Sequence, residues 1–175
     1  MTSGTDEQNI NDLFAATYGE LRRLASAVKG RDQSATLNPT ALVHEAWIKL
    51  SGSPGLMVVS ELHFKRMAAR AMRQVLIEAA RKRHALKRGG DATVLLTTDF
   101  PEAPSIIVDA ELLGLDRALD ELAGMNARQA MMVESRFFGG LEITEIAELL
   151  EVSEATVVRD WRAARAWLAQ ALRGN

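Results

Sequence analysis

The sequence predicts an all-α protein made of two small helical domains joined by a flexible acidic linker. Leu, Ala, Arg and Glu dominate the 175 residues, whereas glycine and proline number only 12 and 4. Apolar residues recur at helical spacing in most segments. That pattern breaks between residues 91 and 108, where Pro101 and Pro104 stand close together. We therefore expect domains at residues 1–90 and 109–175, with residues 91–108 as the linker.

Three helices are predicted in the first domain. The first spans residues 11–29, where apolar side chains recur every three or four positions. Asn38 followed by Pro39 predicts the start of the second, because asparagine caps a helix and proline at its first position loses no hydrogen bond. Residues 51–55 (SGSPG) end that helix, and a long third helix is expected from about residue 61 to residue 87.

Four helices are predicted in the second domain. Capping residues mark their starts, and the pair Gly139-Gly140 marks the end of the second. The expected starts are Asp109, Asn126, Thr144 and either Ser153 or Glu154. Within the linker, Thr93–Thr97 (TVLLT) has the composition of a short strand, but no partner strand is evident.

Charge is distributed very unevenly along the chain, although the formal net charge is only −2. Between Lys65 and Arg88 nine basic residues stand against one acidic residue, and between Ala92 and Ala127 seven acidic residues stand against one basic residue. Such asymmetry is typical of a protein with one surface that meets phosphate. The plainer interpretation is a charged helix face that only meets solvent.

The long third helix has two different faces. Phe64, Ala68, Ala71, Val75 and Ala79 form an apolar stripe. A basic stripe runs along the opposite side and comprises Arg66, Arg70, Arg73, Arg81 and His84. This helix is therefore expected to present one face to a core and an arginine face to a partner.

The segment from Thr144 to Leu172 has the pattern of a helix-turn-helix. Its inner apolar positions are Ile146, Ala147, Leu150, Val152, Val157, Trp161, Ala164 and Leu168. The outer face of the second helix then carries Thr156, Arg159, Arg162 and Arg165. In such a motif the first residues of the second helix reach base edges, while arginines and the helix N-terminus bind phosphates. A plain helical hairpin is the alternative.

Several function classes are disfavoured. The chain has no cysteine, so disulfides, thiolate metal sites and a cysteine nucleophile are excluded. We expect a cytoplasmic protein, because the N-terminus lacks the pattern of a signal peptide and no apolar run reaches the length of a membrane span. His44, His63 and His84 show no catalytic or metal-binding arrangement, and no glycine-rich phosphate loop is present. We expect no enzyme activity, cofactor, metal, membrane contact or small-molecule substrate.

Taken together, three segments resemble the extracytoplasmic-function (ECF) group of sigma factors. They are Leu37–Leu50, which is similar to the family's core-binding helix, His63–Gly90, which is similar to its minus-ten helix, and Ile143–Leu172, which is similar to its minus-thirty-five helix-turn-helix. The resemblance covers nearly the whole chain and keeps the family's order. It implies a sigma factor that binds core RNA polymerase and directs promoter recognition, DNA melting and transcription initiation. An anti-sigma factor is a further candidate partner.

The resemblance also implies residue roles. Core-binding positions are His44, Glu45 and Lys49; minus-ten positions are Arg66, Arg70, Arg73, Arg81, Lys82 and Arg83; minus-thirty-five positions are Thr156, Arg159, Arg162 and Arg165. The chain departs from the family pattern at Ala41 and His44, where Asp and Gln are common. It departs again at Glu151, where the turn often carries glycine, which predicts a turn that either does not require a left-handed backbone or tolerates one at some cost. Val158 and Asp160 stand where many relatives have basic residues, which predicts an unusual base preference.

Two rival functions remain open at the level of sequence. A stand-alone transcriptional regulator would use the same helix-turn-helix as a homodimer, but it would not need a second arginine face in the first ninety residues. A sigma-mimicking adaptor that captures an inhibitor would need no basic face for DNA. The three segments together favour the sigma factor.

Overall fold

A computed structural model describes residues 3–29, 38–53, 58, 60–86 and 109–173. This part of the chain is helical and contains no strand, which confirms the predicted all-α class. The helices are α1 (Ser3–Lys29), α2 (Pro39–Ser51), α3 (Glu61–Leu86), α4 (Asp109–Met125), α5 (Ala127–Gly139), α6 (Ile143–Leu149) and α7 (Glu154–Arg173). The expected linker at 91–108, with its candidate strand Thr93–Thr97, lies outside the described residues.

Local signals in the sequence set most of the helix ends. The Asn38 side chain accepts a hydrogen bond from the backbone N–H of Ala41 at 2.8 Å, and Pro39 opens α2. Asn126 caps α5 in the same way by accepting from the N–H of Gln129 at 3.1 Å. At the other end of α5, Gly140 has the left-handed φ of 66° that glycine adopts without strain. These predicted boundaries are confirmed.

The first helix begins at Ser3 rather than at residue 11. Its apolar stripe starts earlier than predicted, because Ile10 lies one turn before Leu13 and Phe14 and is buried. The short helix α6 also begins one residue early, at Ile143.

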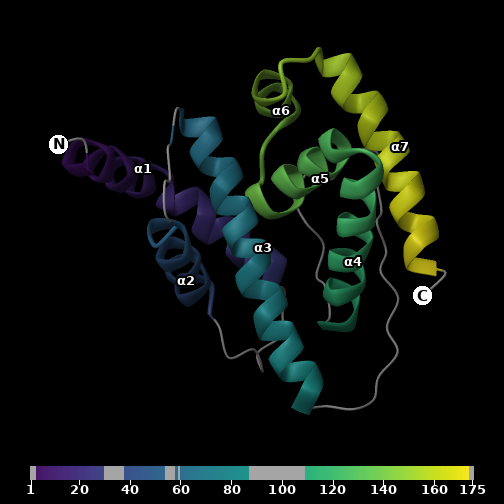
Figure 1. The fold of residues 1–175 in the computed structure, drawn as a ribbon, viewed down its shortest axis with the longest axis horizontal. Coiled ribbons are helices and arrows are strands. Elements are labelled where there is room, and N and C mark those ends of the chain that lie inside the picture. Colours follow the sequence, from purple (N-terminus) through teal and green to yellow (C-terminus); the bar gives the residue numbers. More distant parts are fainter. Residues whose placement is uncertain (1–2, 30–37, 54–57, 59, 87–108, 174–175) are drawn as a thin grey trace.

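The long helix α3 runs through the middle of the molecule (Figure 1). It packs against α1 and α2 on one side and against α4 and α5 on the other, and α6 also touches it. The last helix, α7, packs on α4, α5 and α6 and not on α3. The two predicted domains are therefore in direct contact in this structure.

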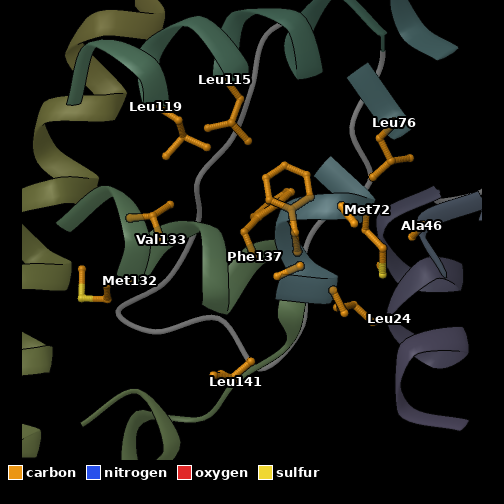
Figure 2. Close-up of a cluster of buried hydrophobic side chains, with 14 of the residues drawn as sticks. Leu24, Ala46, Met72, Leu76, Leu115, Leu119, Met132, Val133, Phe137 and Leu141 are labelled. Carbon is orange, nitrogen blue, oxygen red and sulfur yellow. The ribbon is translucent and has the colours of Figure 1, made fainter. Parts of the chain in front are cut away.

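A single hydrophobic core extends across this contact (Figure 2). Met72 and Leu76 of α3 belong to this core together with residues of α1 and α2 from the first domain and residues of α4 and α5 from the second. The buried residues labelled in Figure 2 are Leu24, Ala46, Met72, Leu76, Leu115, Leu119, Met132, Val133, Phe137 and Leu141.

Small residues allow α3 and α5 to approach closely. Ala69 of α3 is fully buried, and a Cβ atom added to Gly139 would lie only 2.9 Å from the Cβ of Ala69. This close approach brings the basic side of α3 next to acidic residues of α4 and α5.

Candidate nucleic-acid and protein interfaces

Helices α6 and α7 form the predicted helix-turn-helix. Ile146, Val157 and Trp161 are buried between them and the rest of the domain. The backbone N–H of Val152 donates to the carbonyl of Ala147 at 3.0 Å, which fixes the turn between the two helices. The remaining predicted inner residues divide into buried Ala147, Ala164 and Leu168 and half-buried Leu150 and Val152.

The turn carries backbone strain at Glu151. This residue has a φ of 54°, a left-handed conformation that glycine adopts without strain. A non-glycine residue in this conformation costs about 1–2 kcal/mol. The hydrogen bond of its neighbour Val152 helps to hold the strained turn.

The outer face of α7 presents the predicted minus-thirty-five residues. The Arg159 side chain is 72% exposed, and Arg162 is also exposed. Thr156 and Arg165 are half-buried. The Thr156 hydroxyl lies 3.0 Å from that of Ser153, whose oxygen also accepts the backbone N–H of Thr156 at 3.2 Å and so caps the helix.

Asp160 points inward instead of joining this outer face. It is 7% exposed, and its Oδ2 accepts two hydrogen bonds from the guanidinium of Arg128 on α5, at 2.7 and 3.0 Å. Its carboxylate ties α7 to α5, and its Oδ1 also lies 3.8 Å from Nε of Arg159 on the outer face. The unusual base preference stays a prediction. Sequence analysis missed Arg128, because no local pattern links it to a residue in another helix.

The predicted minus-ten residues on α3 have different surroundings. Arg70 and Lys82 are exposed, whereas Arg66 is half-buried and its Nε atom has no hydrogen-bond partner among the described residues. The Arg81 guanidinium is largely exposed but donates to Asp116 Oδ2 at 3.2 Å. The side chain of Arg83 lies outside what the structure describes.

Arg73 is surrounded by acidic residues of the second domain. Its Nε donates to Asp116 Oδ1 at 2.9 Å, its Nη1 donates to Glu134 Oε2 at 2.9 Å, and its Nη2 donates to Asp120 Oδ1 at 2.6 Å. Burial by itself lowers the pKa of Arg73, but the hydrogen bonds to these carboxylates raise it above its ordinary value. Arg73 is therefore a permanent cation here, and acidic groups occupy its donors.

The predicted core-binding residues lie on the outer side of α2. His44 and Glu45 are exposed, and the His44 ring makes an edge contact with the Tyr18 ring. Lys49 is partly engaged, because its Nζ donates to Glu78 of α3 at 2.8 Å. Sequence analysis missed Ile48, which is 61% exposed and precedes Lys49 in the helix.

Other kinds of site are not found in the described part of the chain. Its residues include no group of three histidine, cysteine or acidic side chains placed to hold a metal ion. None of its helices is both long enough and apolar enough to cross a membrane.

Comparison with known proteins agrees with this geometry. The family model for the ECF sigma factor matches residues 1–174. No match was found among curated proteins or among solved structures. Sigma factors are non-catalytic subunits of RNA polymerase. The chain belongs to the ECF sigma factor family, whose members bind core RNA polymerase and direct promoter recognition in transcription initiation.

Proposed function

We propose a division of labour within this sigma factor. Residues 1–90 dock on core RNA polymerase and bind the minus-ten element, residues 109–175 bind the minus-thirty-five element, and residues 91–108 link the two. Because the polymerase holds both domains near the same promoter, each weak contact raises the effective concentration of the other.

The observation that carries this proposal is the outer face of α7. Arg159 and Arg162 are exposed there, while Val157 and Trp161 on the opposite side are buried. A second helix with this arrangement lies in the major groove, where its first turn reaches base edges and its arginines bind phosphates or guanine. Thr156, in the first turn, and Arg165, two turns further along, complete the proposed minus-thirty-five surface.

For polymerase docking we assign the outer side of α2. His44 and Glu45 are exposed, and Ile48 adds an apolar side chain to the same side. Exposed apolar residues flanked by polar ones are common at the centre of protein interfaces. Lys49 belongs to the proposed surface as well, although its bond to Glu78 leaves it less free.

Contact with the minus-ten element is assigned to the basic side of α3. Arg66, Arg70, Arg73, Arg81, Lys82 and Arg83 are the proposed phosphate-binding residues. Such contacts neutralise backbone charge and offset part of the cost of unpairing and unstacking bases, which is a few kcal/mol.

Transcription in vitro with core polymerase tests the proposal directly. Reversing two charges with Arg159→Glu and Arg162→Glu should abolish specific initiation at a promoter that the wild-type protein uses. Binding to core enzyme, measured by gel filtration, should stay unchanged because these side chains lie on α7, far along the chain from the α2 surface. A matched control, Arg22→Glu with Arg117→Glu, reverses two exposed charges outside the proposed surfaces.

Three outcomes would contradict the proposal. Initiation that survives the α7 reversals would remove α7 from promoter reading. Loss of core binding in the same variant would assign these arginines to the polymerase. A wild-type protein that forms a homodimer and binds DNA without polymerase would instead be a stand-alone regulator.

From the family membership we also propose a third partner and a cellular location. An anti-sigma factor would act on the same two domains, and its capture from cells with the tagged chain is the test. The proposed location is the cytoplasm, where polymerase and promoter DNA are found.

A further inference from the structure

We propose that Lys49 of α2 supports promoter binding by neutralising Glu78 of α3. Glu78 is the only acidic residue between Lys65 and Arg88, where nine residues are basic. The inference rests on the proposed role of the basic side of α3 in binding the minus-ten element. It adds to the docking role of Lys49 a positioning role in DNA binding, which acts through another side chain.

The Glu78 carboxylate lies among the proposed phosphate-binding groups. Its side chain is 53% exposed, and it lines a cleft of about 250 Å³ together with Arg70, Arg73 and Arg81. Arg81 and Lys82 also follow it by three and four positions, which places them one helical turn away on the same side of α3. Phosphates bound by these cations therefore come close to a carboxylate.

A carboxylate in this place weakens DNA binding in two ways. It repels phosphates directly, because like charges within about 10 Å of each other interact even at physiological salt. It also attracts the side chains of Arg81 and Lys82, which then have fewer donors left for phosphate. A cation that occupies Glu78 removes both effects.

Lys49 supplies that cation from the neighbouring helix. Helices α2 and α3 pack against each other (Figure 1). The Nζ of Lys49 donates to Oε1 of Glu78 at 2.8 Å, and the Lys49 side chain is 35% exposed. The ion pair leaves little net charge on Glu78 to oppose the approach of DNA.

The C-terminal turn of α2 holds Lys49 in this position. Lys49 belongs to the last turn, where the partial negative charge of the helix end favours a cation. Its backbone carbonyl accepts from the hydroxyl of Ser53 at 2.9 Å, and the carbonyl of Ile48 accepts from the N–H of Gly52 at 3.1 Å. Local hydrogen bonds thus fix the backbone from which the Lys49 side chain reaches Glu78.

A purely structural role explains this pair less well. Ion pairs between exposed side chains contribute little to stability, because water screens the charges and both side chains lose freedom. Buried Val43 and Leu50 of α2 and buried Phe64 of α3 already belong to the core between these helices. Loss of the ion pair should therefore leave the fold intact and change mainly the charge that meets DNA.

Binding of the holoenzyme to a forked minus-ten DNA tests this inference. In Lys49→Met, which removes only the charge, binding should be about five- to tenfold weaker at low salt, and the loss should shrink as added salt screens Glu78. Lys49→Arg keeps the charge and should bind as the wild type does. Arg22→Met, which removes an exposed cation of α1 outside the proposed surfaces, is the matched control.

A second substitution separates a positioning role from direct contact with DNA. In Lys49→Met with Glu78→Gln, the DNA affinity should return at least to the wild-type value, since no unpaired carboxylate remains. Affinity that stays low would show that Lys49 binds phosphate itself and would overturn the inference. Circular dichroism checks that each variant is folded. Glu78→Gln alone gives a further test, because it should bind DNA no more weakly than the wild type.

Failure of this inference differs from failure of the proposed function. Titration of core polymerase with the same variants measures docking, and transcription measures initiation. If Lys49→Met lowers core binding while its assembled holoenzyme binds DNA as the wild type does, Lys49 acts at the polymerase alone and the inference is wrong. No initiation by the wild type on any promoter would refute the proposed function instead.

Discussion

At the scale of single residues, the carboxylate of Asp160 attaches α7, the helix that we propose reads DNA, to α5. Its two bonds to Arg128 join α7 to α5, and its side chain is only 10% exposed. An asparagine in place of a buried aspartate has nearly the same volume, but it cannot make the charge-assisted hydrogen bonds that the carboxylate makes. Asp160 therefore holds the part of α7 that carries Arg159 and Arg162 against α5.

Replacing Asp160 with asparagine should lower the free energy of unfolding by about 1–3 kcal/mol. The substitution weakens both bonds from Arg128 without leaving a cavity. Chemical denaturation measures the effect, and a double-mutant cycle with Arg128→Met isolates the pair. Independent, additive effects of the two substitutions would show that the pair contributes nothing to stability.

Some features of single residues could be predicted from the sequence and others could not. Asn38-Pro39, Asn126 and Gly140 were predictable because capping depends on neighbouring residues alone. The surroundings of Arg73 were not, since its partners Asp116 and Glu134 lie 43 and 61 positions away. An arginine opposite an apolar stripe gives the same sequence pattern whether solvent or a second domain covers it.

At the scale of helices, the contact between α3 and α5 depends on two small residues. Gly139 and Ala69 lie so close that a Cβ atom added to Gly139 would be 2.9 Å from the Cβ of Ala69. Contacts this short do not occur between real side-chain carbons, so the helices would have to separate. The contacts of Arg73 of α3 with Asp116 and Glu134 cross from α3 to α4 and α5, so they also depend on this approach.

Gly139→Ala should therefore destabilise the protein by about 1–3 kcal/mol, although alanine favours helices more than glycine does. Adding Ala69→Gly should recover part of the loss, because it removes the atom that the new methyl group meets. Gly124→Ala is the matched control: its Cβ has open space, and stability should rise by up to about 1 kcal/mol. Thermal denaturation measures the stability of the three variants. A Gly139→Ala protein as stable as the wild type would refute the tight contact.

At the scale of the whole molecule, both predicted domains share one core, which sequence analysis did not anticipate. A flexible linker suggested two independent units. In the structure α3 instead belongs to both units, because α2 covers one side of its apolar surface and α5 covers the other. The all-helical class followed from composition and periodicity, whereas this docking depends on residues distant in sequence.

A shared core predicts that both halves unfold together. Trp47 reports on the first half, and Trp161 and Trp167 report on the second. One variant keeps only Trp47, and a second keeps only Trp161 and Trp167. In each variant, the denaturation midpoint from tryptophan fluorescence should equal the midpoint from circular dichroism, which reports on all helices. Two separate midpoints would show that the halves are independent.

The exposed Ile48 has a consequence for the lifetime of the assembled polymerase. Water surrounds most of this side chain in the free protein. Covering it at the proposed docking surface would contribute about 1–2 kcal/mol. Within one interface such differences appear mainly in the dissociation rate. A single isoleucine on α2 would thus lengthen the residence time on core enzyme by about tenfold.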